Sequence, residues 1–175
     1  TGTDSTAVEA KDALSTYQVA DGFKIEMIAS EPLISDPVDM EIDEFGRMYV
    51  VEMHGYPLDL SRTGKVKLLK DTNNDGYPDT STVFADSLRL PTGIMRWNKG
   101  IIITDTPDVI YLEDTNNDGK ADKQSVFADG LHLPLGFEIA TEGVYVSQGT
   151  NLKLLMAPNG DGKADIFWTN TSTGD

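Results

Sequence analysis

Two short acidic segments carry the residues best suited to binding a cation. Both follow the pattern DxNxDGxxD, over residues 71–79 and 114–122. In such loops the side chains at positions 1, 3 and 5 converge on one point and the carbonyl at position 7 joins them. Position 9 contributes directly or through water, and glycine at position 6 allows a sharp turn. The expected ligands are Asp71, Asn73, Asp75, the carbonyl of Tyr77 and Asp79 in the first loop, and Asp114, Asn116, Asp118, the carbonyl of Lys120 and Asp122 in the second.

The donors of both loops are hard oxygens, which indicate calcium rather than zinc or copper. An EF-hand is excluded because position 12 is Thr82 or Ser125 instead of Glu, and both loops join β-like runs. Without the bidentate Glu, we expect a dissociation constant of about 10⁻⁴ to 10⁻³ M. The alternative is an ordinary Asn/Asp/Gly turn without metal. Three carboxylates brought together twice argue against that alternative, since uncompensated like charges oppose folding.

A third, degraded copy of the loop begins at Ala157. It has lost the acidic residue at position 1, so a plain turn is the better interpretation there. Its remaining candidate ligands are Asn159, Asp161 and Asp165.

The acidic loops belong to a repeat with a period of 43 residues. Residues 71–91 and 114–134 are identical at 14 of 21 aligned positions. Each unit contains about four short β-like runs bounded by turn residues, which is the size of one propeller blade. The units begin near residues 37, 91 and 134. The first unit is longer by 11 residues, which we interpret as a loop inserted around residues 53–64.

This repeat predicts an all-β fold, a partial β-propeller with about three four-stranded blades of a ring of six, over residues 21–175. A β-solenoid is the rival architecture, but its coils have shorter periods and fewer strands. Residues 1–20 are expected to form an amino-terminal segment with a short helix over residues 6–15. An extra strand is expected at residues 23–29. Three blades leave open edges, so we expect further blades or another chain to close the ring.

Composition excludes several classes of function. The chain has 14 basic and 29 acidic residues, a net charge of −15, which disfavours binding to nucleic-acid phosphates. The absence of Cys excludes disulfides, thiolate zinc sites, iron–sulfur clusters and covalent haem attachment within these 175 residues. No apolar run approaches the roughly 20 residues of a transmembrane helix.

Three polar residues, Glu52, Asp105 and Gln148, close equivalent apolar runs in the three units. Their repetition predicts a ring of polar groups at the mouth of the axial channel. Glu52 or Asp105 could remove a hydroxyl proton in an alcohol oxidation, and His54 is a further candidate base. The simpler interpretation is that these residues solvate the channel mouth or cap turns.

The chain resembles a known family over residues 13–57 (ALSTYQVADGFKIEMIASEPLISDPVDMEIDEFGRMYVVEMHGYP), 64–94 (GKVKLLKDTNNDGYPDTSTVFADSLRLPTGI) and 109–122 (VIYLEDTNNDGKAD). These segments are similar to the amino-terminal part of the membrane-bound dehydrogenase or sorbosone dehydrogenase-like β-propellers. That family is of planctomycete, verrucomicrobial and Bacteroidetes type and is often fused to cytochrome c. This chain has His54 where the family often has Arg.

The resemblance implies a six-bladed propeller in an extracytoplasmic location, whether periplasmic, secreted or at the cell surface. It also implies oxidation of sugars or related alcohols with pyrroloquinoline quinone, with cytochrome c as electron acceptor. The alternative is a non-catalytic propeller platform that binds a polysaccharide or a protein complex. An adhesive, integrin-like calcium repeat matches less well, because VFADxLxLP follows both intact acidic loops.

Overall fold

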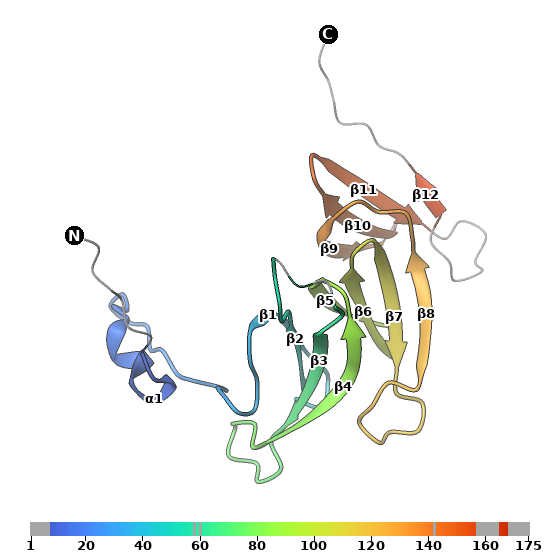
Figure 1. The fold of residues 1–175 in the computed structure, drawn as a ribbon. Helices are drawn as coiled ribbons and strands as arrows, with labels where there is room; N and C mark the ends of the chain where they lie inside the picture. Colours follow the sequence, from blue (N-terminus) through green and yellow to red (C-terminus); the bar gives the residue numbers. More distant parts are fainter. Residues whose placement is uncertain (1–7, 58, 60, 142, 157–164, 168–175) are drawn as a thin grey trace.

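Three four-stranded antiparallel sheets follow one another along the chain (Figure 1). The computed structural model describes residues 8–57, 59, 61–141, 143–156 and 165–167. The first sheet contains β1 (Pro37–Ile42), β2 (Met48–Glu52), β3 (Gly64–Lys70) and β4 (Thr80–Leu88). The second contains β5 (Pro91–Trp97), β6 (Gly100–Asp105), β7 (Asp108–Glu113) and β8 (Lys123–Ala128). The third contains β9 (Pro134–Ala140), β10 (Gly143–Gln148), β11 (Asn151–Met156) and β12 (Asp165–Phe167).

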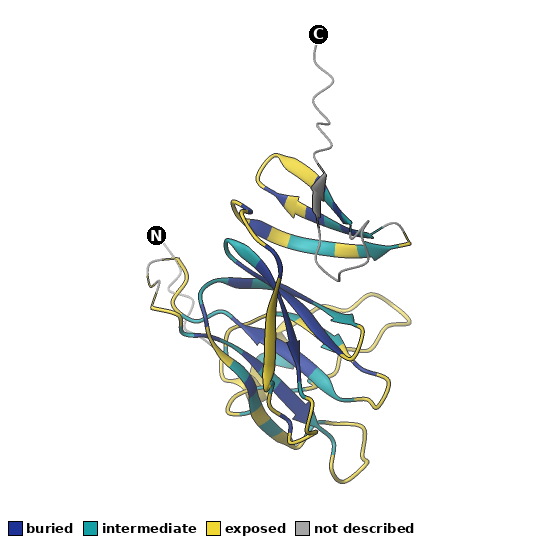
Figure 2. Cartoon of the chain, turned by 90° about the vertical axis from the view of Figure 1, so that its right-hand side faces the viewer, coloured by how far each residue is buried: buried dark blue, intermediate teal, exposed yellow. Residues whose placement is uncertain are grey.

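The strands of each sheet lie side by side in chain order, and successive sheets pack face to face as blades. The first strands are neighbours, because β5 contacts both β1 and β9. The predicted fold class, a partial β-propeller, is therefore confirmed. The interior of the stack is buried and its loops are exposed (Figure 2).

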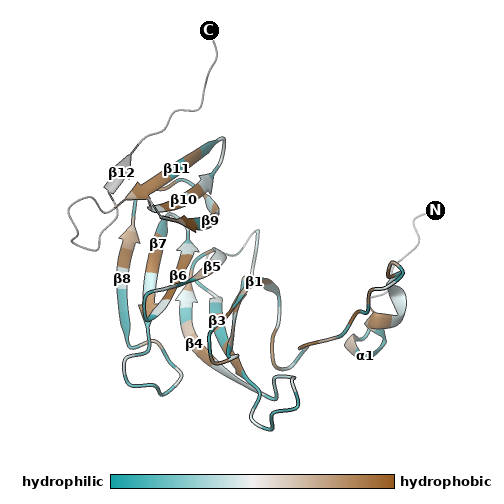
Figure 3. Cartoon of the chain, turned by 180° about the vertical axis from the view of Figure 1, so that it is seen from behind, coloured by the Kyte–Doolittle hydropathy of each residue, from teal (hydrophilic) through white to brown (hydrophobic). Residues whose placement is uncertain are grey.

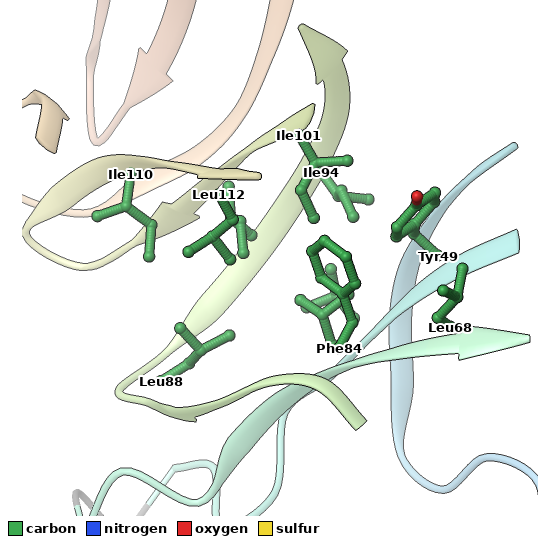
Figure 4. Close-up of a cluster of buried hydrophobic side chains, with 11 residues drawn as sticks. Tyr49, Leu68, Phe84, Leu88, Ile94, Ile101, Ile110 and Leu112 are labelled. Carbon is green, nitrogen blue, oxygen red and sulfur yellow. The ribbon is translucent and has the colours of Figure 1, made fainter. Parts of the chain in front are cut away.

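Side chains on opposite faces of the second blade pack against different neighbours. Ile101 and Ile103 point to the first blade, where they join Tyr49, Val51 and Phe84 in one apolar cluster (Figure 4). Ile102, between them in sequence, points to the third blade instead. This follows from the two-residue period of a β-strand, which sends successive side chains to opposite faces.

A second cluster joins the second and third blades. Ile102, Tyr111 and Phe127 pack there against Val144 and Val146. Apolar residues recur along β6, β7 and β11 (Figure 3), and those of the second blade pack on both of its faces. A sheet that is apolar on both faces is stable only between two neighbours.

The same irregularity in strand pairing occurs where the first two strands of each blade meet. The pairing register shifts after Pro37 in the first blade and after Pro91 in the second, and between Ser147 and Gln148 in the third. A bulge at this point bends the first strand and increases its twist. The structural repeat thus extends to local detail.

The amino-terminal segment differs from the prediction. The helix expected over residues 6–15 is a single turn, α1 (Ala10–Ala13), followed by a 3₁₀ turn at Leu14–Thr16; residues 1–7 lie outside the described part. The strand expected at residues 23–29 is wrong, because this stretch pairs with no strand of the described sheets. Its apolar side chains, among them Ile25 and Ile28, line a groove of about 560 Å³ instead. Residues of β1 and β2 line the same groove.

Neither of these two short turns is long and apolar enough to cross a membrane, and the described residues contain no other helix.

Glycine is required at the start of β6. A Cβ atom on Gly100 would lie 2.0 Å from the carbonyl oxygen of Leu112 on β7, whereas one on Gly136 would meet only Ser147 Oγ at 3.9 Å. We expect Gly100→Ala to lower the free energy of unfolding by about 1–3 kcal/mol, the usual cost of overpacking. The control Gly136→Ala should change it little. Chemical denaturation measures both, and equal effects would contradict this account.

Candidate functional site

The two acidic loops lie at the same end of neighbouring blades. Residues 71–79 connect β3 to β4, and residues 114–122 connect β7 to β8 (Figure 1). Both connections join the two outer strands of a blade, away from the first strands that pack side by side. The loops are thus at the rim of the propeller.

The first loop is held by hydrogen bonds from its own backbone to its acidic side chains. The two carboxylate oxygens of Asp71 accept the N–H groups of Asp75 at 3.3 Å and Gly76 at 2.8 Å. The side-chain oxygen of Asn73 accepts the same Asp75 N–H at 2.9 Å, and Asp75 Oδ1 accepts the N–H of Tyr77 at 2.8 Å. Gly76 has φ +94°, the left-handed conformation that glycine adopts readily.

The second loop repeats these contacts. Asp114 accepts the N–H groups of Asp118 at 3.2 Å and Gly119 at 2.8 Å. The Asn116 oxygen accepts from Asp118 at 2.9 Å, and Asp118 Oδ1 accepts from Lys120 at 2.9 Å. Equivalent atoms therefore have equivalent partners in both loops.

The carboxylate at position 9 faces a threonine at position 2. Asp79 accepts the N–H and the hydroxyl of Thr72, and Asp122 accepts the same two groups of Thr115. These bonds hold the pKa of both carboxyls below the ordinary Asp value. The two threonines are site residues that sequence reasoning missed, although their identity in both loops was the available signal.

The donor set of the loops fits a hard cation, since it consists of carboxylate, amide and carbonyl oxygens. The described residues contain no group of three Asp, Glu, His or Cys side chains arranged to hold a metal, so a cation in these loops would also need the Asn and main-chain carbonyl oxygens. In the third loop Asn159 and Asp161 lie outside the described residues, and the backbone of Asp165 is at the start of β12.

The second loop also contacts the preceding blade. The N–H of Ala121 donates to the carbonyl of Phe84 on β4 at 2.8 Å. The equivalent position in the first loop is Pro78, which has no N–H to donate. The second loop is therefore tied to two blades at once.

The polar residues at the ends of the second strands are buried and already hydrogen-bonded. Glu52, Asp105 and Gln148 are 1%, 8% and 4% exposed. Each occupies the last position of its strand, opposite the proline that begins the first strand of the same blade.

Each of these side chains accepts backbone N–H groups from the connection that leads into its blade. Glu52 accepts from Ser35 at 2.8 Å, and Gln148 accepts from His132 at 3.1 Å. Asp105 Oδ1 accepts from Arg89 at 2.7 Å and Leu90 at 2.9 Å. Their geometry is that of caps on the blade-to-blade connections, and it leaves these oxygens little freedom to act as bases.

His54 lies between two carboxylates. Its Nδ1 is 2.9 Å from Asp36 Oδ2, and its Nε2 is 3.0 Å from the second carboxylate oxygen of Glu52. The two acids occupy opposite nitrogens of the ring, so the three groups cannot converge on a metal. The arrangement instead ties the connection before β1 to the loop after β2.

The capping carboxylate of Asp105 carries an electrostatic cost. Burial raises its pKa, and the N–H groups of Leu90 and Arg89 oppose that rise only in part. Since the folded-state pKa lies above the ordinary value of 3.8, the folded state binds the proton more tightly than the unfolded state. The corresponding stability is present below pH 3.8 and is lost as the pH rises through the folded-state pKa.

Replacing this carboxylate by an amide tests the capping role. Asp105→Asn keeps an acceptor oxygen, as Gln148 does naturally, so we expect its stability relative to the wild type to increase from acidic to neutral pH. Asp105→Ala loses the acceptor and should unfold about 1–3 kcal/mol more easily. Denaturant titrations across this pH range measure both effects. An Asn variant as unstable as the Ala variant would refute the capping role.

The chain belongs to the family described as "Domain of unknown function (DUF7133)", whose model matches residues 9–126 and 109–169. A search of curated proteins found no match.

Among solved structures, the chain is similar to one from the crystal structure of a nidogen/laminin complex, with a TM-score of 0.59 and 17% sequence identity. The similarity covers 84% of this chain and 52% of that one, so this chain spans about half the length of its structural neighbour. That neighbour is a β-propeller, in agreement with the arrangement of the three sheets.

Proposed function

We propose that this chain is a calcium-binding part of an extracytoplasmic, dehydrogenase-like β-propeller. The observation that supports calcium binding most directly is the matching set of hydrogen bonds in residues 71–79 and 114–122. Two separate loops hold their Asp and Asn oxygens in the same way, on the same pattern of residues. Loops without a bidentate Glu are expected to bind calcium weakly, in the range typical of extracellular modules, which would suit an extracytoplasmic location.

Calcium would be held by the side-chain oxygens of positions 1, 3 and 5 and by the carbonyl of Tyr77 or Lys120. Its charge would offset the repulsion among the three carboxylates of each loop. Binding to the second loop would also stabilise the contact between two blades, because Ala121 bonds to Phe84. We therefore assign calcium a structural role.

Removal of calcium tests this proposal. A ligand that binds only the folded state stabilises it, so excess calcium should raise the melting temperature and a chelator should lower it. With calcium at about 100 times its dissociation constant, each loop would add about 2.7 kcal/mol. Calorimetry in calcium, in magnesium and in chelator gives the comparison, and identical melting in all three would exclude a calcium site.

A matched pair of variants locates the effect. Asp114→Asn should abolish the calcium-dependent part of the stability that the second loop provides. Asp129→Asn removes the same charge from a residue outside the loop and should keep it. If both variants lost the calcium response equally, overall charge rather than loop binding would explain it.

We also propose that further blades or another chain complete the ring. Met48 and Val50 on β2 alternate with Tyr49 and Val51, which pack against the second blade. They line the groove on the opposite face of the first blade. At the other end of the array, Tyr145 lines a hollow of about 250 Å³ on the outward face of the third blade. Both terminal faces thus offer surface for a neighbouring sheet.

Oxidation of sugars or alcohols with pyrroloquinoline quinone, with cytochrome c as acceptor, is the catalytic form of this proposal. It rests on the family resemblance and on His54, a titratable side chain held in place at the end of the blade. The strand-end residues do not fit the cofactor, because a quinone with several carboxylates would meet the carboxylates of Glu52 and Asp105.

The alternative is a non-catalytic platform for a polysaccharide or a protein complex. It is supported by the hydrogen bonds that Glu52, Asp105 and Gln148 already make to backbone N–H groups. Quinone-dependent reduction of a dye by the complete propeller, with sugars as electron donors, separates the two. Activity that requires both sugar and quinone supports the dehydrogenase. Its absence, together with binding on a glycan array, supports the platform.

A further inference from the structure

A polar pocket of about 470 Å³ lies on the first blade, at the end opposite the acidic loop. The residues around it come from the loop after β2, the start of β3 and the end of β4. They are His54, Arg62, Thr63, Lys65, Asp86 and Ser87.

The basic residues of this pocket have no basic counterpart at the equivalent positions of the other two blades. Lys65 pairs with Glu52 across the sheet, and the corresponding partners in the second and third blades are Asp108 and Asn151. Arg62 belongs to the inserted loop over residues 53–64, which the other units lack. The shared scaffold of the blades therefore does not account for a lysine and an arginine at this place.

Neither cation is neutralised by an ion pair within the described residues. Arg62 donates from Nη1 to the carbonyl oxygen of Ser87 at 3.3 Å, and neither it nor Lys65 forms a salt bridge there. The charge of Arg62 also lowers the pKa of the buried Asp105, against the larger effect of burial. In a chain with 29 acidic and 14 basic residues, two cations that line one pocket and form no salt bridge within the described residues favour an anionic ligand.

Two of the residues around the pocket, His54 and Thr63, are held by hydrogen bonds. Arg62 has φ +59°, a conformation that costs energy in a residue other than glycine and that occurs often at functional sites. The hydroxyl of Thr63 donates to the carbonyl of His54 at 2.9 Å. The ring of His54 is fixed in turn between Asp36 and Glu52. Residues that are fixed before binding reduce the conformational entropy that binding costs.

We propose that this pocket binds a sugar acid, with its carboxylate at Arg62 and Lys65. A guanidinium matches a carboxylate through two parallel hydrogen bonds. Asp86 and Ser87 offer acceptors for neighbouring hydroxyl groups, and Asp86 disfavours the higher charge of phosphate or sulfate. The inference deepens the proposed carbohydrate-binding role and is independent of calcium.

Titrations of the 175-residue chain, followed by NMR, test the site. Galacturonate should bind and shift the amide signals of residues 62–65 and 86–87, whereas galactose, sulfate and phosphate should not. Arg62→Gln and Lys65→Gln should each weaken binding roughly tenfold, about the effect of losing one charge-assisted hydrogen bond. Lys99→Gln removes an equal charge from the turn between β5 and β6 and should leave binding unchanged.

Arg62→Lys keeps the positive charge, so it should bind galacturonate more tightly than Arg62→Gln. This comparison distinguishes loss of the charge from a folding defect. Equal binding of galactose and galacturonate, or equal affinities in Arg62→Gln and Lys99→Gln, would overturn the proposal. Binding of sulfate in preference to galacturonate would also overturn it, as would binding of pyrroloquinoline quinone alone. Repeating the titration in chelator, at a temperature at which the chain remains folded, separates this site from the calcium loops. Galacturonate should still bind there.

Discussion

The structure depends on blades that are apolar on both faces. Ile101 and Ile103 need the first blade to cover them, while Ile102 needs the third. No blade can bury its side chains alone, so the sheets must stack, and the twist of each sheet turns the stack around an axis. The same requirement applies to Met48 and Val50 on the first blade, whose face is partly covered by the amino-terminal segment.

Polar groups at the strand ends complement this packing. One side chain per blade, whether Glu52, Asp105 or Gln148, satisfies N–H groups of the incoming connection. Three different residue types perform the same task, because only an acceptor oxygen at the right place is needed. A carboxylate carries an additional desolvation cost that an amide avoids, which is visible in the raised pKa of Asp105.

The repeat made the blades predictable from sequence. Identical residues 43 positions apart must occupy equivalent environments, and the first strands do begin at Pro37, Pro91 and Pro134. The strand expected at residues 23–29 was wrong, because alternation of apolar residues does not reveal whether a sheet edge is available to pair with. The equivalence of Glu52, Asp105 and Gln148 was visible in sequence, but their backbone partners depend on the path of the connections. The pocket beside Arg62 was missed because it joins segments up to 33 residues apart.

The hydrogen bond from Ala121 to Phe84 joins the second blade to the blade that precedes it in the chain. Through this bond the second blade contacts the first, whereas the first loop has Pro78 at the equivalent position and no N–H to donate. During synthesis the ribosome releases the amino-terminal blade first. The acceptor Phe84 is therefore synthesised before its donor Ala121, so the order of translation matches the order in which these two blades can join.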